Sequence, residues 1–264
     1  MNRQDQYQLH KHYIEANGLH LLIDFEENVD YKEGVYDSVN GNLNISIPPE
    51  TDDLIRLHKL IRSRKSFTIL EFGLGYSTII MADALAKNQR DWSALDEKPQ
   101  IRNRFMFQLF SLDASTEWIE KTQSAIPEHL IHRIHIQQSD VEIGTFNGQL
   151  CHYYQNLHDI VPDFIYLDGP SAKDVKGRYR GLSFGCDERT VMAADLLLME
   201  PTFLPGTFII VDGRTNNARF LERNLSRSYQ IKWDADNDIT TFELNEKRLG
   251  KYNVLGSDFF DSTN

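Results

Sequence analysis

The sequence contains little cysteine, fewer basic than acidic residues, and no long apolar run. Among its 264 residues there are two cysteines, Cys151 and Cys186. Two cysteines are too few for a disulfide framework and lack zinc-site spacing, so we expect buried or neutral thiols. The chain has 28 basic and 39 acidic residues, a formal net charge of -11. An acidic surface repels nucleic-acid phosphates and anionic membranes, which disfavours nucleic-acid and membrane partners.

The hydrophobic pattern of the sequence also shows no targeting segment and no membrane-spanning segment. The start of the sequence has no apolar run after a basic residue, so we expect no secretory signal. No apolar stretch approaches the roughly 18 residues that a membrane-spanning helix needs. We therefore expect a cytoplasmic protein. Hydrophobic residues make up 41% of the chain, which is enough for one sizeable core.

From residue 67 onward the apolar pattern alternates between strands and helices. Strands are predicted at 67–71, 107–112, 131–137, 164–167 and 207–211, and a terminal hairpin at 229–233 and 240–244. Helices are predicted at 77–86, 116–125, near Cys151, at 188–199 and at 216–225. This order predicts an α/β fold: a doubly wound, mostly parallel seven-stranded sheet with an antiparallel last strand and helices on both faces.

The remaining segments divide the chain into two parts. Residues 1–50 are polar, and we expect a short helix followed by an irregular segment that forms a lid or an oligomer contact, such as a homodimer interface. Thr51 opens a helix with acids in its first turn and bases in its last, which suits the helix dipole, and residues 51–264 form the predicted Rossmann-like domain. Two charged insertions, 87–104 and 171–186, are expected at the surface as lids or disordered loops.

The strongest local signal is a glycine loop after the first predicted strand. Glu71 ends the strand, Gly73 and Gly75 follow, and a helix begins near Ser77. Ligands of open α/β sheets bind at this type of turn, where glycine permits close approach of the backbone. A dinucleotide site would place a third glycine where Thr78 stands, and the carboxylate of Glu71 suits a cationic amine better than a phosphate.

Four stretches together resemble one enzyme family. They are 71–77, which reads Glu-Phe-Gly-Leu-Gly-Tyr-Ser, and the strand-end stretches 110–118, 139–141 and 162–170. On these residues the chain resembles the class I, Rossmann-like S-adenosylmethionine-dependent methyltransferases. It is most similar to the branch of catechol O-methyltransferase and of bacterial biosynthetic-cluster enzymes. The resemblance covers residues 51–249 and implies S-adenosylmethionine as cofactor and a small-molecule acceptor.

The resemblance implies a role for each matching residue. Glu71 would face the methionine amino group across the loop, and Gly73 and Gly75, followed by Tyr76 and Ser77, would admit the cofactor. Asp113, followed by Ala114, would bind the ribose hydroxyls. Asp140 would accept from the adenine amine, with the backbone of Val141 assisting, and Asp168 would stand at the methyl-transfer point. From the residues alone, Glu71 remains open to being an ordinary strand-end acid, and Asp113 to being a residue that only precedes a helix.

Acceptor chemistry has several candidate residues. Asp168, Lys173 and Asp212 are the predicted catalytic residues, with Arg214 beside them, and Arg178 and Arg180 could recognise an acidic group on the acceptor. In metal-dependent relatives the acids at 168 and 212 bind magnesium together with an asparagine directly after the second acid. Here Gly213 occupies that position, so a divalent metal is doubtful. His129, His132 and His135 are expected to diverge rather than converge on a metal.

Other functions of the same fold remain open. A nicotinamide-dependent oxidoreductase or epimerase would need a glycine at position 78 and a catalytic pair that we do not find. Aminopropyl transfer would need an extra acid where Gly169 and Pro170 stand. A non-catalytic binding module would have no physical need for acids at three strand ends. The expected function is therefore O- or N-methylation of a small molecule.

Overall fold

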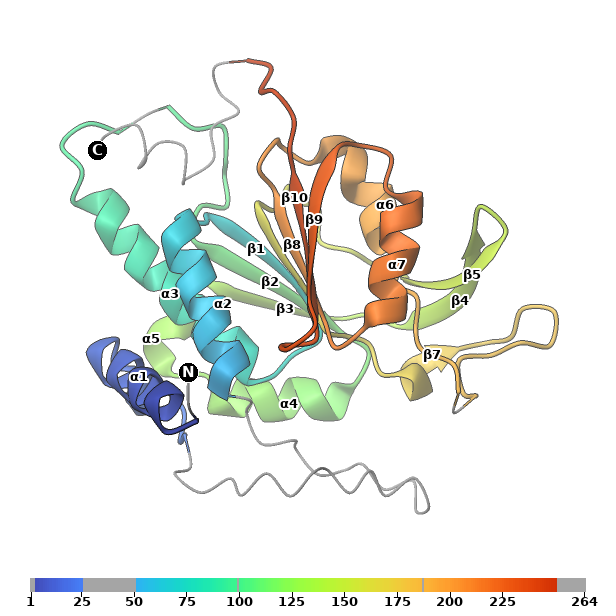
Figure 1. Cartoon of the computed structure of the whole chain (residues 1–264), viewed down its shortest axis with the longest axis horizontal. Helices are drawn as coiled ribbons and strands as arrows, with labels where there is room; N and C mark the ends of the chain where they lie inside the picture. Colours follow the sequence, from blue (N-terminus) through green and yellow to red (C-terminus); the bar gives the residue numbers. More distant parts are fainter. Residues whose placement is uncertain (1–2, 26–50, 99, 187, 251–264) are drawn as a thin grey trace.

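A seven-stranded sheet forms the centre of the molecule in the computed structural model, which describes residues 3–25, 51–98, 100–186 and 188–250 (Figure 1). The strand order is β3-β2-β1-β6-β8-β10-β9. The strands are β1 (Thr68–Phe72), β2 (Gln108–Asp113), β3 (Ile134–Gln138), β6 (Phe164–Leu167), β8 (Phe208–Asp212), β9 (Tyr229–Asp234) and β10 (Ile239–Leu244). Only β10 is antiparallel to β8, while β3, β2, β1, β6 and β8 are parallel. The predicted sheet, with its antiparallel last strand, is confirmed.

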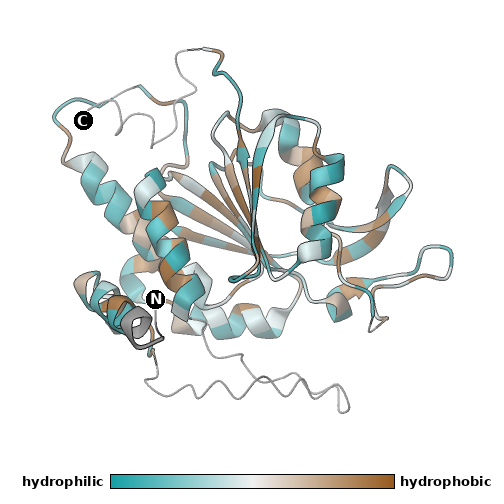
Figure 2. Ribbon diagram, in the orientation of Figure 1, coloured by the Kyte–Doolittle hydropathy of each residue, from teal (hydrophilic) through white to brown (hydrophobic). Residues whose placement is uncertain are grey.

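Helices cover both faces of this sheet (Figure 1). They are α1 (Arg3–Ala16), α2 (Thr51–Arg64), α3 (Tyr76–Ser93), α4 (Thr116–Ala125), α5 (Glu128–Ile131), α6 (Asp195–Met199) and α7 (Thr215–Asn224). Two apolar cores result, because neighbouring strand residues point to opposite faces. Leu70 and Phe72 pack into the core with α6 and α7, whereas Ile69 packs into the core with α2 and α3. The central strands β1, β6 and β8 are accordingly mainly buried, and hydrophobic residues run through the middle of the sheet in Figure 2.

A second sheet replaces the helix predicted near Cys151. Three strands form it: β4 (Val141–Phe146), β5 (Gln149–Tyr154) and the short β7 (Val175–Lys176). β4 and β5 are joined by Asn147 and Gly148, whose φ values are 49° and 74°. Two residues with positive φ are the usual turn of a two-residue hairpin, and Asn-Gly is its strongest sequence signal. The helix prediction was wrong because this turn lets residues 149–154 pair with β4 as a strand.

Three other boundaries differ from prediction. The helix predicted at 77–86 continues to Ser93, because Lys87 bonds to Asp83 one turn earlier and the amide of buried Asn88 donates to the Ile61 carbonyl. The start of the insertion 87–104 is therefore helical. The helix predicted at 188–199 is reduced to α6, because the backbone N–H of Ala193 donates instead to the Asn217 side chain. The third strand begins at Ile134, after the short α5.

The first helix packs on the domain. The Tyr13 hydroxyl and His58 Nδ1, on α2, are 2.7 Å apart, and Ile14, Leu19 and Ile23 belong to the core beside α2 and α3. The predicted lid or oligomer contact falls mainly on residues 26–50, which lie outside the described residues, and it stays a prediction. Within the described part of the chain, no helix is both long and apolar enough to cross a membrane.

Candidate functional site

The loop between β1 and α3 is held tightly against the loop that follows β6. Gly73 has a φ of 102°, a conformation that side chains rarely adopt. A Cβ atom on Gly169 would lie 2.6 Å from the backbone nitrogen of Gly73, so neither position has room for a side chain. Gly75 differs, because its backbone is extended and a Cβ there would meet nothing within 4 Å. The packing of the two loops therefore requires glycine at positions 73 and 169, but not at position 75.

Glu71 is fully buried beneath this loop. Its carboxylate accepts hydrogen bonds from the hydroxyls of Ser77 at 2.5 Å, Thr78 at 2.8 Å and Ser111 at 2.6 Å. Burial raises the pKa of Glu71 to about 7, although the three hydroxyls act in the opposite direction. The carboxyl group therefore anchors the first turn of α3 to β1 and β2. Any attraction for a bound cation acts across the loop, because both carboxylate oxygens already accept from hydroxyls.

A cavity of about 540 Å³ opens beside the glycine loop. The residues that line it are Asp53, Leu54, Leu74, Gly75, Tyr76, Ser77, Ile79, Trp118, Lys121, Thr122, Ala125, Tyr166, Asp168, Asp212, Gly213, Asn237 and Asp238. Four carboxylates and a single lysine are among them, so the cavity favours cationic ligands. Of the predicted site residues, the structure brings Gly75, Tyr76, Ser77, Asp168 and Asp212 together here.

The two predicted catalytic acids are each tied to a second residue. The Tyr166 hydroxyl donates to Asp212 Oδ2 at 2.5 Å, and Tyr166 is only 4% exposed. Burial and the nearby charges of Asp168 and Asp212 raise the pKa of Tyr166 well above its usual range, so the phenol stays a donor. Arg214 donates to the backbone carbonyls of Asp168 and Pro170, and its guanidinium lies 3.7 Å from a carboxylate oxygen of Asp168.

Sequence reasoning missed part of this wall. In the sequence, Tyr166 belongs to the predicted strand 164–167, and Asn237 and Asp238 lie between the two strands of the predicted hairpin. A polar side chain within an otherwise apolar strand could have singled out Tyr166. Asp53 was read only as a partner of the dipole of α2. No local pattern could have placed Asp53 and Asp238 beside Asp168, because these residues lie on α2, in the β9–β10 turn and after β6, which are far apart in the sequence.

Asp113 ends β2 outside the lining of this cavity. It is 8% exposed, and its Oδ1 accepts the backbone N–H of Ser115 at 2.8 Å. Ser115 in turn accepts the N–H of Trp118 and caps α4. Burial raises the pKa of Asp113 to about 6, and the negative charge of Asp174 acts in the same direction. The structural role left open from the sequence is thus real, and a ribose-binding role for Asp113 and its neighbour Ala114 stays a prediction.

The other predicted residues also lie outside the cavity lining. Asp140 pairs with Lys176 of β7 at 2.8 Å and accepts from the Gln138 amide at 3.2 Å. Val141 is fully buried at the start of β4. Lys173 is exposed on the 3-10 turn Ala172–Asp174. Their roles toward an adenine or an acceptor stay predictions.

Metal ligation finds no support among the described residues. In the ranges that the structure describes, no group of three His, Cys, Asp or Glu side chains is placed to hold a metal ion. The three histidines singled out above have separate surroundings. His135 lies 2.9 Å from the Gln108 amide oxygen, His132 lies beside the Arg133 guanidinium, and His129 is exposed on α5.

Comparison with known proteins gives matches among solved structures alone. No protein-family model matches the chain, and no curated protein sequence matches it. The O-methyltransferase TomG from Streptomyces achromogenes, solved with S-adenosylmethionine, is 16% identical at a TM-score of 0.41, over 75% of this chain and 82% of its own.

Two further matches have similar scores. An O-methyltransferase from Bacillus cereus, solved with S-adenosylhomocysteine, is 14% identical at a TM-score of 0.40, over 89% and 90% of the two chains. An RNA methyltransferase from Salinibacter ruber is 12% identical at a TM-score of 0.37, over 77% of this chain and 97% of its own. The function proposed below rests on the residues of the site.

Proposed function

We propose that this chain is an S-adenosylmethionine-dependent methyltransferase that methylates an oxygen or nitrogen of a small molecule. One observation carries the proposal: a glycine loop at the carboxyl end of β1 is backed by the buried carboxyl of Glu71 and faces a cavity rich in aspartates. The same arrangement favours a sulfonium cofactor over a dinucleotide, for the following reasons.

The charge of the site disfavours a dinucleotide. A pyrophosphate would normally sit on the free N–H groups at the start of α3. Here the Gly75 N–H donates to the Thr78 hydroxyl at 3.2 Å, and the Ser77 and Thr78 hydroxyls both donate to Glu71. A phosphate would meet Asp168 and Asp212 as well. A sulfonium ion with an amino group is cationic and suits these carboxylates.

The residues at the strand ends fit the rest of the cofactor. Asp113 lies at the end of β2, beside the strand that carries the glycine loop, and its carboxylate retains acceptor capacity beyond its bond to Ser115. A carboxylate in that place suits the two hydroxyls of a ribose. The free thiols of Cys151 and Cys186 are in keeping with a reducing cytoplasm, which we propose as the location.

The chain's own residues would align the acceptor and take its proton. When bound, the cofactor supplies a methyl group on a positively charged sulfur. Arg214 fixes the β6 loop through the carbonyls of Asp168 and Pro170, which holds Asp168 at the cavity wall. Tyr166 orients Asp212, whose carboxylate would accept a proton from an acceptor hydroxyl or amine. Fixed alignment of this kind supplies much of the acceleration in a displacement reaction.

Calorimetric titration tests the proposal directly. The full chain is titrated with S-adenosylmethionine, S-adenosylhomocysteine and NAD, in parallel with Asp113→Asn and with Asp159→Asn, a control at a fully exposed acid. Micromolar binding of the sulfonium or its product, weakened about tenfold or more in Asp113→Asn and unchanged in the control, supports the proposal. Binding of NAD instead, or of none of the three, overturns it.

A further inference from the structure

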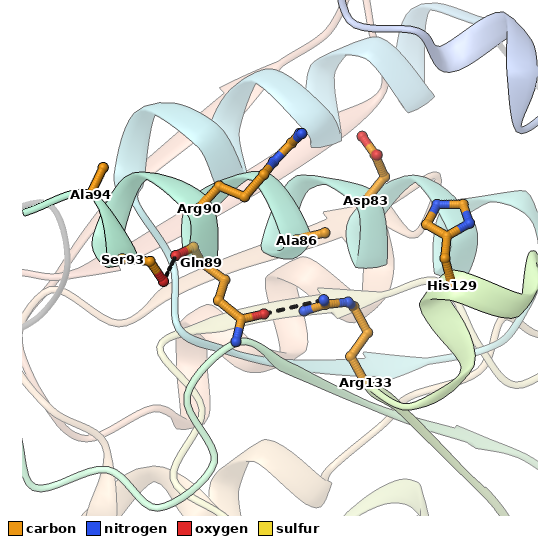
Figure 3. Close-up of a pocket in the computed structure, with 8 residues that line it drawn as sticks. All are labelled: Asp83, Ala86, Gln89, Arg90, Ser93, Ala94, His129 and Arg133. Atoms are coloured by element: carbon orange, nitrogen blue, oxygen red, sulfur yellow. Dashed lines mark hydrogen bonds between the residues drawn. The ribbon is translucent and has the colours of Figure 1, made fainter.

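A groove of about 660 Å³ lies at the opposite edge of the sheet from the glycine loop. Its lining residues are Asp83, Ala86, Gln89, Arg90, Ser93, Ala94, His129 and Arg133 (Figure 3). Arg133 directly precedes β3, whereas the proposed cofactor site lies where the parallel strands end. Helix α3 runs from one site to the other, with Tyr76 in the cavity and Ser93 in the groove. The groove is therefore a separate feature of the molecule.

Arg133 is a buried cation with no carboxylate among its hydrogen-bond partners in the described ranges, and its guanidinium lies 3.2 Å from the His132 ring. It is 5% exposed, and its guanidinium donates to the Phe107 carbonyl and to the Gln89 side-chain oxygen, each at 3.2 Å. Its third nitrogen, Nε, is buried without a hydrogen-bond partner in the described part of the chain. Buried charges in proteins are normally paired with an opposite charge. Arg133 therefore points to an anion that completes its surroundings.

Asp83, the acid of the groove, already interacts with Lys87 and His58. Its Oδ2 accepts from Lys87 and lies 3.0 Å from His58 Nε2, on the side of α3 that faces α2. The same interactions lower the pKa of Asp83, although burial acts against them. Asp83 therefore makes no hydrogen bond to Arg133, and although its negative charge raises the pKa of Arg133, burial lowers that pKa more.

Two further basic side chains line the groove with Arg133. Arg90 extends from α3, and His129 extends from α5 (Figure 3). Both are exposed, and no carboxylate of the described ranges forms an ion pair with Arg90. Two arginines and a histidine thus line one hollow of a protein whose formal net charge is -11. A positive hollow on an acidic protein is a selective feature, since it attracts a small anion that the rest of the surface repels.

We propose that this groove binds the phosphate group of a small molecule. Guanidinium groups hold phosphate oxygens through pairs of charge-assisted hydrogen bonds, and Arg90 supplies an exposed group of this kind, while Arg133 adds a buried positive charge to the same groove. The Gln89 amide and the imidazole of His129 add donors at the same wall. The volume exceeds what one phosphate fills and lies within the usual range of small-ligand sites, so a phosphate ester fits better than the free ion.

Binding measurements with two phosphate probes test this site. Inorganic phosphate and ribose 5-phosphate are titrated into the full chain in chloride buffer. The variants are Arg90→Ala and His129→Ala, both at exposed side chains, with Arg219→Ala on α7 as the matched control on another face. Arg133 is left intact because its buried hydrogen bonds hold the start of β2.

Saturable binding that weakens about tenfold or more in Arg90→Ala, weakens in His129→Ala and is unchanged in Arg219→Ala is the expected result. Tighter binding of ribose 5-phosphate than of inorganic phosphate assigns the site to an ester, and the reverse assigns it to the free ion. The proposal is overturned if neither probe binds saturably, or if the wild type and Arg90→Ala bind the probes equally well. These results do not depend on methyl transfer, because the substituted residues lie away from the cofactor cavity.

Discussion

Replacing Glu71 with glutamine should change how the stability of this protein depends on pH. The pKa of Glu71 is raised by burial from its ordinary 4.5 to about 7. Between these values the folded chain keeps a proton that the unfolded chain has released, so stability falls as pH rises from 4.5 to about 7 and levels off above it. At 1.36 kcal/mol per pH unit, this single group removes about 3 kcal/mol of stability over that window.

Urea unfolding from about pH 5 to pH 8 measures the effect. The glutamine keeps the shape of Glu71 and can still bond to Ser77, Thr78 and Ser111, but it does not titrate. The free energy of unfolding of the wild type minus that of Glu71→Gln should therefore fall by about 2 to 3 kcal/mol over this range. The other buried acids, Asp113, Asp163 and Asp195, titrate in both proteins and cancel in the difference. A difference that stays flat, or rises with pH, would refute the assignment of a raised pKa to Glu71.

Three further substitutions test other parts of the structure. Gly169→Ala should separate the β1 and β6 loops and abolish cofactor binding in titrations, because its Cβ would lie 2.6 Å from Gly73 N, whereas Gly75→Ala should fold and melt like the wild type. Asp163→Ala should lower the free energy of unfolding by about 2 to 4 kcal/mol, because Asp163 accepts hydrogen bonds from the buried N–H groups of Phe67 and Thr68 at 2.8 and 2.9 Å. The control Asp159→Ala, at an exposed side chain, should change the free energy of unfolding by about 0.5 kcal/mol or less. Equal losses in the two variants would contradict this role of Asp163. Tyr166→Phe should reduce methyl-transfer turnover about tenfold or more at unchanged cofactor affinity, and unchanged turnover would remove Asp212 orientation from the mechanism.

The sequence predicts correctly those parts of the site that depend on neighbouring residues. The glycine loop, its strand and its helix form one continuous segment. Asp113 and Asp212 end buried strands and Asp168 follows one, and apolar blocks identify these strands in the sequence. Parallel strands bring their carboxyl ends to one edge, so residues at these ends were predictably neighbours. The β4–β5 hairpin was not predicted, although the Asn147-Gly148 turn that forms it is visible in the sequence.

Long-range pairings, by contrast, had no local signature. Tyr166 and Asp212 are 46 residues apart, and their hydrogen bond depends on the side-by-side pairing of β6 and β8. Arg133 in the groove bonds to Gln89, 44 residues earlier, across the packing of α3 against the sheet. A charged residue before a strand is ordinary in a sequence, and it becomes unusual only when packing buries it without a counter-ion.

The sequence by itself determined the alternation of strands and helices, the sheet that this alternation forms, and the glycine turn at its first strand, because hydrophobic periodicity and backbone freedom are properties of neighbouring residues. The tertiary structure decided the protonation of Glu71, the pairing of Tyr166 with Asp212, the aspartate-lined cavity and the basic groove. These depend on burial and on the distances between side chains from different elements. Electrostatic energies vary with both, and neither is fixed until the elements pack.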